Sequence, residues 1–253
     1  MRPEIPYRIF IGHDVNETVA ANVARESLLS HTDPSAVDID RICRLSLWRQ
    51  YRRPTTRMPS GQLFDELSGA PMSTDHAIAR FFVPYLCGYE GWALFLDGDV
   101  LVREDIRKLF ALANDDYAVQ VVQHPPQLEE RDKKGGQIQQ AYPRKNWSSV
   151  MLFHCGHPAN QRLTLDVLNT WPGRDLHGFT WLDDDQIGRL PARWNYLVHV
   201  HDFDPTPALV HYTLGVPDME GHAGDPFAPE WFGIKHALGY ETKEDVRDTA
   251  TKS

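Results

Sequence analysis

Blocks of hydrophobic and polar residues alternate along the chain in a pattern that predicts strands and helices in turn. Strand-length apolar runs occur at residues 7–12, 37–45, 91–96, 117–123, 149–153 and 208–212. Between them, apolar residues recur at the intervals typical of amphipathic helices, at residues 16–30, 73–85, 106–113 and 161–171. This alternation predicts an α/β domain in which helices cover both faces of a mostly parallel sheet.

Two features interrupt this pattern. Pro84 lies inside the helix expected at 73–85, where it should kink or end the helix because proline has no backbone N–H. Residues 125–145 form a polar run with the sequence KKGG (133–136) at its centre. A polar run of this length inside a compact domain is either a functional lid or a disordered segment.

The C-terminal part of the chain differs in composition from the rest. From Pro217 onward Gly and Pro become more frequent, and the end of the chain is rich in charge. We therefore expect a main α/β domain at residues 1–217 and a C-terminal extension at residues 218–253 whose end is disordered.

The size and charge of the chain exclude several classes of protein. Its 253 residues suffice for one α/β domain with a sizeable core and a peripheral extension. With 26 Lys and Arg against 35 Asp and Glu, the formal net charge is −9. Proteins that bind long nucleic acids present basic surface, so this balance argues against a nucleic-acid partner.

Cysteine usage and hydrophobicity indicate a cytoplasmic protein. Cys43, Cys87 and Cys155 have no CxxC spacing, so neither a disulfide framework nor a zinc knuckle is predicted. The first apolar run has the length of a strand rather than of a signal-peptide core, and no segment approaches the length of a membrane span. We therefore expect a soluble protein with no integral membrane segment.

The stretch ALFLDGDVLV (93–102) is the most informative motif of the chain. It is apolar except around Asp97 and Asp99, which follow a predicted strand. Open α/β sheets bind ligands at the carboxyl ends of their strands, and two carboxylates at this spacing can converge on one divalent cation that neutralises a diphosphate. The alternative is a turn, since Asp-Gly is strong turn chemistry, but a turn explains only one of the two aspartates.

This stretch and four further segments resemble the GT-A fold glycosyltransferases, and in particular the retaining enzymes of family eight. Asp97-Gly98-Asp99 is similar to the DxD motif that follows an apolar strand in that family. The other segments occur in the family's order: IGHDVNE at 11–17, ARF at 79–81, DDQI at 184–187 followed by LP at 190–191 and WN at 194–195, and HYTLGVP at 211–217. The resemblance implies a single-domain, Rossmann-like GT-A fold.

The resemblance also implies a metal site. In the family, a histidine of the last motif completes the metal site of the DxD aspartates, which assigns the metal ligands to Asp97, Asp99 and His211. Two carboxylates, one imidazole and two diphosphate oxygens suit Mn²⁺, because Mn²⁺ accepts mixed oxygen and nitrogen ligands more readily than Mg²⁺ does. We expect Mn²⁺, with Mg²⁺ as the alternative.

The activity that the resemblance implies is transfer of a sugar from a nucleotide sugar, most simply a UDP-sugar, to a carbohydrate or other hydroxyl acceptor, with retention of anomeric configuration. The catalytic residues it implies are Asp185 and Gln186. The donor-binding residues it implies are Asp14, Arg80, Asp97, Gly98, Asp184 and Gly215.

Each of these residues also has a simpler structural interpretation. Arg80 could be an ordinary solvated arginine, and His211 a histidine satisfied at a strand end. Asp183-Asp184-Asp185 could be the acidic first turn of a helix, which the helix dipole favours. Trp147 and Trp181 flank the expected site and could stack on a sugar ring, although such tryptophans more often belong to the core.

The chain departs from the family pattern at two places. The family's lysine in the last motif is absent, because Val216 and Pro217 stand there. A cation that would stabilise the leaving diphosphate must then come from elsewhere. The candidates are Lys134, Arg144, Lys145, His222 and Lys235. The segment Asn146-Trp147-Ser148-Ser149 lacks the glycine that the family places before its next apolar strand.

Three other functions remain open at this point. The sequence HVHDFD would place His199 and His201 on one face of a strand, as in zinc-dependent hydrolases. The pair Asp97 and Asp99 also resembles a phosphatase motif with an aspartate nucleophile, although that motif normally reads DxDG and occurs early in the chain. A nonenzymatic nucleotide-sugar binder is the third alternative, since the missing lysine weakens only catalysis.

Overall fold

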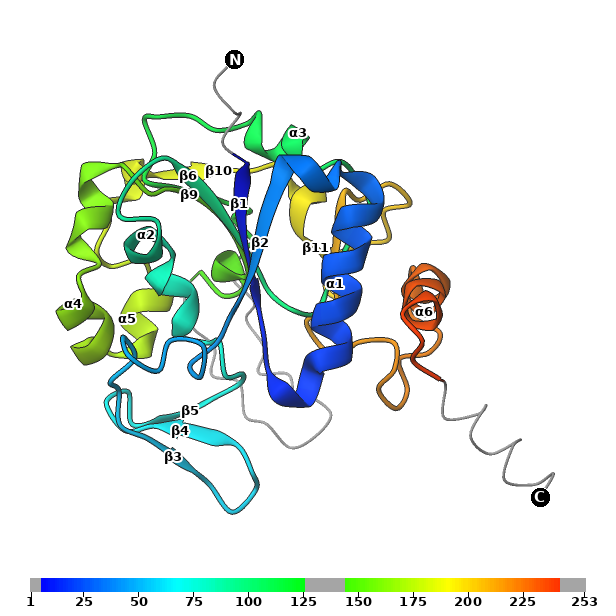
Figure 1. Cartoon of the computed structure of the whole chain (residues 1–253), viewed down its shortest axis with the longest axis horizontal. Coiled ribbons are helices and arrows are strands. Elements are labelled where there is room, and N and C mark those ends of the chain that lie inside the picture. Colours follow the sequence, from blue (N-terminus) through cyan, green and yellow to red (C-terminus); the bar gives the residue numbers. More distant parts are fainter. Residues whose placement is uncertain (1–5, 126–143, 242–253) are drawn as a thin grey trace.

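The computed structural model of the chain describes residues 6–125 and 144–241. Its centre is a six-stranded sheet with the order β10-β8-β9-β6-β1-β2 (Figure 1). These strands are β1 (Tyr7–Gly12), β2 (Val37–Ile42), β6 (Trp92–Leu96), β8 (Val119–Val121), β9 (Val150–His154) and β10 (Ile187–Arg189). The pairs β1–β2, β1–β6 and β8–β10 are parallel, whereas β9 is antiparallel to both neighbours. The expected α/β fold with a mainly parallel sheet is confirmed.

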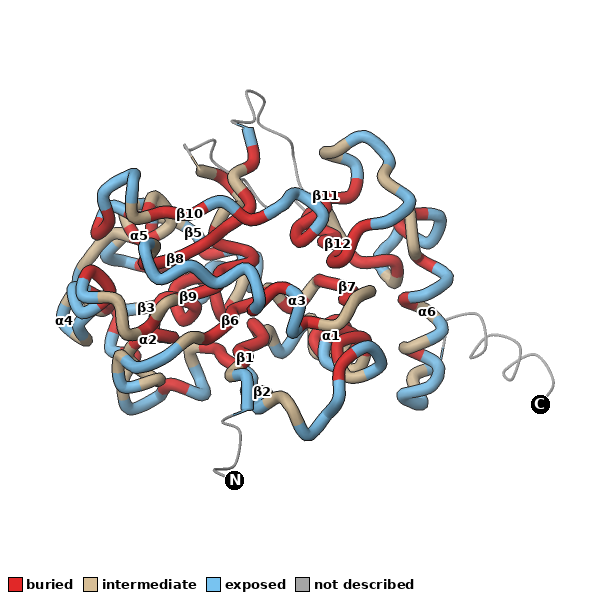
Figure 2. The backbone as a smooth tube through the Cα atoms, turned by 90° about the horizontal axis from the view of Figure 1, so that it is seen from above, coloured by how far each residue is buried: buried red, intermediate tan, exposed pale blue. Residues whose placement is uncertain are grey.

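Helices cover both faces of this sheet. They are α1 (Thr18–His31), α2 (Val83–Leu86), α3 (Arg107–Phe110), α4 (Leu165–Thr170), α5 (Gly173–His177) and α6 (Ala228–Ala237). Figure 1 shows α1 on one side of the sheet and α2, α4 and α5 on the other. On β1, Ile9 and Ile11 join one core cluster and Phe10 joins the other. Figure 2 shows the resulting burial along the central strands, which explains their near-continuous apolar sequence.

Two smaller sheets complete the fold. One is an antiparallel meander of β3 (Thr55–Arg57), β4 (Leu63–Asp65) and β5 (Ala70–Met72). The other consists of β7 (Val100–Val102), β11 (Tyr196–Leu197) and β12 (Leu209–His211). Because β12 pairs antiparallel with β7 and parallel with β11, late segments of the chain lie beside the strand that follows the DGD stretch.

The described residues also contain short 3₁₀ helices. They are η1 (Val15–Glu17), η2 (Pro34–Ala36), η3 (Ala79–Phe82), η4 (Trp147–Ser149), η5 (Pro158–Arg162), η6 (Asp184–Gln186) and η7 (Ala192–Asn195). Of these, η1, η3 and η5 overlap segments expected as α-helices. Within the segment expected as one helix at 73–85, η3 is followed by α2. Pro84 lies in the first turn of α2, where no intrahelical N–H bond is lost, and η3 ends at Phe82 just before it. The helix expected at 73–85 is therefore interrupted at this proline.

The C-terminal extension packs onto the main body through α6. Trp231 of α6 is fully buried in a cluster with Val23 of α1 and Val210 of β12. The boundary at residue 217 stays a prediction. The KKGG centre of the polar run, including Lys133 and Lys134, and the end of the extension lie outside the described residues. Within residues 6–125 and 144–241, no helix combines the length and hydrophobicity needed to cross a bilayer.

A buried ion pair joins the β3–β5 meander to the rest of the molecule. The side chains of Arg53 and Asp65 are 0% and 1% exposed, and Arg53 Nε donates to Asp65 Oδ1 at 3.1 Å. Arg53 Nη1 also donates to the carbonyl oxygens of Leu168, at 3.0 Å, and Trp171, at 2.8 Å, around the end of α4. The arginine thus satisfies carbonyl groups that the end of a helix leaves without intrahelical partners.

We predict that Arg53→Ala lowers the free energy of unfolding by about 3–5 kcal/mol, because it leaves the Asp65 carboxylate buried and unpaired. Urea denaturation followed by circular dichroism measures the change. Arg52→Ala is the matched control, since Arg52 is exposed, and it should change the value by less than about 0.5 kcal/mol. Equal effects of the two substitutions would contradict the assignment.

Candidate functional site

A cavity of about 330 Å³ opens at the carboxyl end of β6 and brings together several of the residues singled out in the sequence. Asp97 and Asp99 line it together with His211 from the end of β12. Arg80 lines it from η3. Its position agrees with the general rule that open α/β sheets bind ligands beyond the carboxyl ends of their strands.

The DGD stretch carries the chain from the central sheet to a small sheet. β6 ends at Leu96 and β7 begins at Val100, so both aspartates lie in the short connection between the strands. A Cβ atom on Gly98 would come within 2.5 Å of the Gly12 carbonyl oxygen. Glycine is therefore required at position 98 because two backbone segments approach closely there, in addition to the turn that the Asp-Gly sequence suggested.

Asp97 is held by two cationic or hydrogen-bonding side chains. Arg80 Nη2 lies 2.8 Å from Asp97 Oδ1, and His76 Nε2 lies 3.1 Å from the same oxygen. Burial alone would raise the pKa of the Asp97 carboxyl, but the charge of Arg80 and the hydrogen bond from His76 lower it far below its usual range. Asp97 is therefore an ionised carboxylate throughout the neutral pH range.

His211 reaches Asp99 because of strand pairing. In the antiparallel ladder of β12 and β7, His211 lies opposite Val100, and the Tyr212 N–H donates to the Asp99 carbonyl at 3.0 Å. His211 Nε2 then lies 3.3 Å from Asp99 Oδ1. A ligand pair more than a hundred residues apart in sequence is thus set by the register of two short strands.

Asn195 fixes the tautomer of His211. Ser149 Oγ donates to the Asn146 carbonyl at 2.6 Å, so it accepts from Asn195 Nδ2, which lies 2.8 Å away. This orients Asn195 Oδ1 toward His211 Nδ1, at 3.1 Å. Since an amide oxygen only accepts, His211 carries a proton on Nδ1. Its Nε2 is consequently the ring nitrogen that faces Asp99.

The three groups fit a divalent cation. One ligand atom from each of Asp97, Asp99 and His211 lies within 4.8 Å of the others. His211 Nε2 and Asp99 Oδ1 lie 3.3 Å apart, a separation at which either a proton or a metal ion between the two atoms would join them. Two carboxylates and one imidazole form a donor set suited to first-row divalent ions such as Mn²⁺.

Asp14 lines a second cavity that adjoins the first. Its Oδ1 accepts from the Asn16 N–H and its Oδ2 accepts from the Asp75 N–H, both at 2.9 Å. The second cavity has about 340 Å³ and shares Ser73 and Thr74 with the first. Asp14 therefore positions the segment that separates the two cavities.

The DDQI segment (184–187) does not line the cavity that contains the metal-binding candidates. Among the described residues, the lining of the first cavity includes neither Asp184, Asp185 nor Gln186. Gln186 Oε1 accepts from the Asp183 N–H at 3.1 Å in a capping box, as the interpretation of this segment as an acidic helix start implies. Asp184 pairs with Arg144. The catalytic assignment of this segment stays a prediction.

The candidate replacements for the missing lysine differ in where their side chains lie. Lys145 is buried and lines the first cavity. Lys235 Nζ instead lies 2.7 Å from Asp218 Oδ1, and Arg144 is paired with Asp184. Gly215 does not line the cavity either; a Cβ there would come within 2.9 Å of His222 Nε2, so its small size makes room for this imidazole.

Sequence analysis missed two residues that shape the site. His76 precedes Arg80 by four residues, and the hydrogen bond from the Arg80 N–H to the His76 carbonyl at 3.2 Å shows that they lie one helical turn apart. This spacing was the available signal. His177 lies 2.8 Å from Ser148 Oγ through Nδ1, and burial, followed by the charge of Arg80, lowers its pKa to about 3. No sequence pattern indicated His177.

The two tryptophans belong to the core. Trp181 is 1% exposed, and its Nε1 donates to Asn160 Oδ1 at 3.1 Å. Trp147 packs against the same core cluster and donates to the His124 carbonyl at 2.9 Å.

The expectation for HVHDFD was wrong. His199 and His201 follow β11 in a turn rather than on one face of a strand, and His199 has a φ of 63°. His201 Nε2 lies 3.2 Å from His124 Nδ1, whereas His199 Nε2 lies 2.7 Å from Asp225 Oδ1. The two histidines therefore have different partners. The run is too short to be told from a turn by alternation alone.

Comparison with solved structures supports the fold. No protein-family model matches the chain. The galactosyltransferase LgtC, solved in complex with donor and acceptor sugar analogues, has a TM-score of 0.57 at 14% identity over 94% of this chain and 98% of LgtC. The bifunctional glycosyltransferase WbbM has a TM-score of 0.59 at 15% identity over 93% of this chain. This chain spans 50% of the length of WbbM. At these identities the likeness shows the GT-A fold alone.

A closer relative is found by sequence. Protein CDI of Arabidopsis thaliana is 37% identical over 246 residues, which cover 95% of this chain and 90% of Protein CDI. Identity at this level over nearly the whole of both chains establishes common family membership. The chain, with its GT-A fold, therefore belongs to the family of Protein CDI.

Proposed function

We propose that the chain is a metal-dependent glycosyltransferase that moves a sugar from a nucleotide sugar, with UDP-sugar as the expected donor, to a hydroxyl acceptor with retention. The observation that carries this proposal is the convergence of Asp97, Asp99 and His211 on one cavity at the carboxyl end of β6, within a GT-A fold. The proposal is supported by LgtC, which shares this fold and was solved with donor and acceptor sugar analogues.

Asp97, Asp99 and His211 would hold Mn²⁺ in this proposal. The ion supplies positive charge against the diphosphate that departs with the nucleotide. Arg80 and His76 keep Asp97 ionised and oriented. Asn195 keeps the His211 Nε2 lone pair directed at the site.

The adjoining cavity is proposed to take the nucleoside. Asp14 lines this second cavity, which shares Ser73 and Thr74 with the first. A nucleotide sugar is an elongated ligand, and two adjoining cavities suit its nucleoside and diphosphate-sugar halves. Gly98 allows the backbone contact that brings β1 close to the DGD stretch, and so positions both cavities.

Asp184, Asp185 and Gln186 are proposed to contact the sugar from the rim of the site. Arg144, the chain neighbour of Lys145, pairs with Asp184 and donates to the Gly178 carbonyl at 2.7 Å, so η6 is tied to a segment that lines the cavity. In the retaining mechanism that we propose, Asp185 hydrogen-bonds sugar hydroxyls and Gln186 lies on the face opposite the leaving group. Gly215 acts indirectly, by making room for His222.

Asp99→Asn should abolish the dependence of UDP binding on Mn²⁺, because it removes one of the charged ligands. Isothermal titration calorimetry with UDP, with and without Mn²⁺, measures this. We expect wild-type affinity to rise at least tenfold with Mn²⁺ and the variant to show no such rise. Asp116→Asn is the matched control, since Asp116 is exposed and outside the cavity. Metal-independent binding of wild type would defeat the site assignment.

The calorimetry is paired with an activity screen that separates the alternatives. Slow hydrolysis of one nucleotide sugar in a panel would identify the donor and support transfer. Binding of nucleotide sugars without hydrolysis or transfer would instead indicate a nonenzymatic binder. Phosphate release from simple phosphate esters would indicate a phosphatase.

Asn195→Ala should weaken Mn²⁺ affinity about 10–100-fold without removing a ligand, because His211 loses the acceptor that fixes its tautomer. Mn²⁺ titration followed by electron paramagnetic resonance of the free ion measures the affinity. Asn169→Ala is a control for asparagine truncation, since Asn169 hydrogen-bonds around α4, away from the cavity. Unchanged affinity in Asn195→Ala would show that the tautomer is set by other means.

We propose that Lys145 replaces the lysine missing after Gly215. Lys145→Ala should lower kcat about 10²–10³-fold and change KM much less, because the lost charge stabilises the leaving diphosphate mainly in the transition state. Steady-state kinetics with the donor found in the screen measure the effect. Lys108→Ala, on the exposed surface of α3, serves as the control. A KM effect with unchanged kcat would assign Lys145 to ground-state binding.

A further inference from the structure

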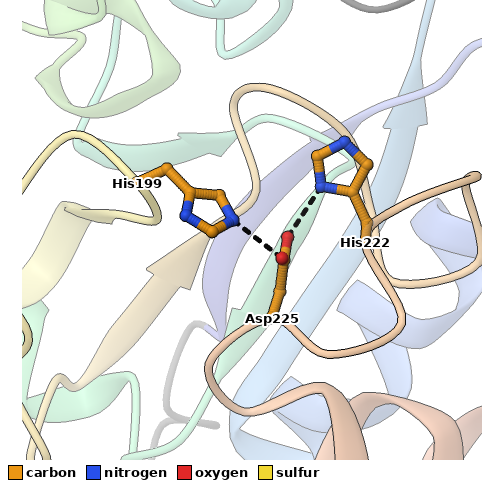
Figure 3. Close-up of side chains that lie close together, drawn as sticks. All are labelled: His199, His222 and Asp225. Atoms are coloured by element: carbon orange, nitrogen blue, oxygen red, sulfur yellow. Dashed lines mark hydrogen bonds and ion pairs between the residues drawn. The ribbon is translucent and has the colours of Figure 1, made fainter.

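A second group of potential metal ligands lies outside the cavity described above. His199, His222 and Asp225 each offer one ligand atom, and these atoms lie within 4.8 Å of one another. Figure 3 shows both imidazoles directed at the two oxygens of the Asp225 carboxylate. His199 Nε2 lies 2.7 Å from Asp225 Oδ1, and His222 Nδ1 lies 2.7 Å from Asp225 Oδ2. The group shares no residue with Asp97, Asp99 and His211.

The three residues come from two separate segments. His199 belongs to the turn after β11, whereas His222 and Asp225 belong to the loop between β12 and α6. The loop is itself ordered by short contacts: the Asp225 N–H donates to the His222 carbonyl at 3.0 Å, and Tyr212 Oη donates to the Pro226 carbonyl at 3.1 Å. An ion bound here would join the C-terminal segment to the body of the protein.

Two of the three potential ligands are buried. The side chains of His222 and Asp225 are 9% and 6% exposed, so their positions are fixed by packing. Gly215 contributes to this arrangement, because any larger residue there would collide with His222 Nε2. The His199 side chain is 46% exposed, so it can adjust to an ion.

We propose that His199, His222 and Asp225 bind a divalent first-row transition ion, for which Zn²⁺ is the preferred candidate. Two imidazole nitrogens and one carboxylate oxygen suit Zn²⁺, whereas Mg²⁺ and Ca²⁺ prefer oxygen ligands alone. With Zn–N bonds of about 2.0–2.1 Å, tetrahedral ligands lie roughly 3.3 Å apart. The two contacts of 2.7 Å to Asp225 would lengthen, and the ligand atoms, which lie within 4.8 Å of one another, would adjust through the exposed His199.

Binding would replace the two hydrogen bonds to Asp225. Each imidazole nitrogen must present a lone pair to the ion, so the proton it carries is released or moves to the other ring nitrogen. The carboxylate then turns from a hydrogen-bond acceptor into a ligand. This site does not depend on the proposed glycosyl transfer, and an absence of transferase activity would leave it untouched.

The test uses the chain of 253 residues carrying Asp99→Asn, which removes one ligand of the first group and so weakens its contribution. After treatment with a chelator, this protein is titrated with Zn²⁺ in competition with a chromophoric chelator. We expect one tight Zn²⁺ per chain and a rise in Tm of roughly 5 °C or more at an ion concentration about 100 times the Kd.

His199→Ala in the same background should weaken Zn²⁺ binding at least about 100-fold and remove the rise in Tm. Asp225→Asn, which keeps the shape of the side chain, should have the same effect. His236→Ala, at an exposed histidine of α6, is the matched control and should bind Zn²⁺ as the parent does.

Two results would overturn the proposal. One is the absence of stoichiometric Zn²⁺ binding in the Asp99→Asn protein. The other is equal binding by His199→Ala and His236→Ala, which would place the ion elsewhere. In either case Asp225 would be only an acceptor that ties two histidines together.

Discussion

The carboxylate of Asp97 at the end of a buried strand is the constraint on which the rest of the site depends. A charge in this position is tolerated only if other groups compensate for lost hydration. Arg80 and His76 do so, and both come from the segment that precedes β6 in the chain. In that segment η3 packs Phe81 and Phe82 into the core, while Arg80 lines the cavity.

Much of the fold followed from the sequence because the central strands are buried on both faces. Their continuous apolar character, as in β6, marks them clearly. The short strands β7 and β11 carry no such mark, since two or three residues hold no measurable period. The apolar run at 208–212 did predict β12, but not its pairing with β7 and β11. The antiparallel direction of β9 could not be inferred from the sequence either. A helix that connects two strands implies parallel pairing, but an apolar run alone gives no strand direction.

The candidate site, like the fold, could be predicted only in part from the sequence. Asp97 and Asp99 were named in advance because two carboxylates at this spacing suit a divalent cation, and His211 was named through the family resemblance. The structure places the three side chains together. His76 belongs to none of the family's motifs, and Asn195 was named only as part of WN (194–195), without a role. Their importance arises from hydrogen bonds to other side chains, which depend on distances between segments that a sequence does not contain.

The contact between Gly98 and Gly12 has a consequence for the position of the DGD stretch. The backbones of the DGD stretch and the end of β1 meet here with no side chain between them, so a larger residue at position 98 would fit only if the two segments moved apart. Since β1 and β6 are paired strands of the central sheet, such a movement would disturb their pairing. Lys145 is placed differently, because it lies in a turn between the left-handed backbones of Arg144 and Asn146. The central sheet therefore holds the two aspartates of the cavity, whereas a turn holds its lysine.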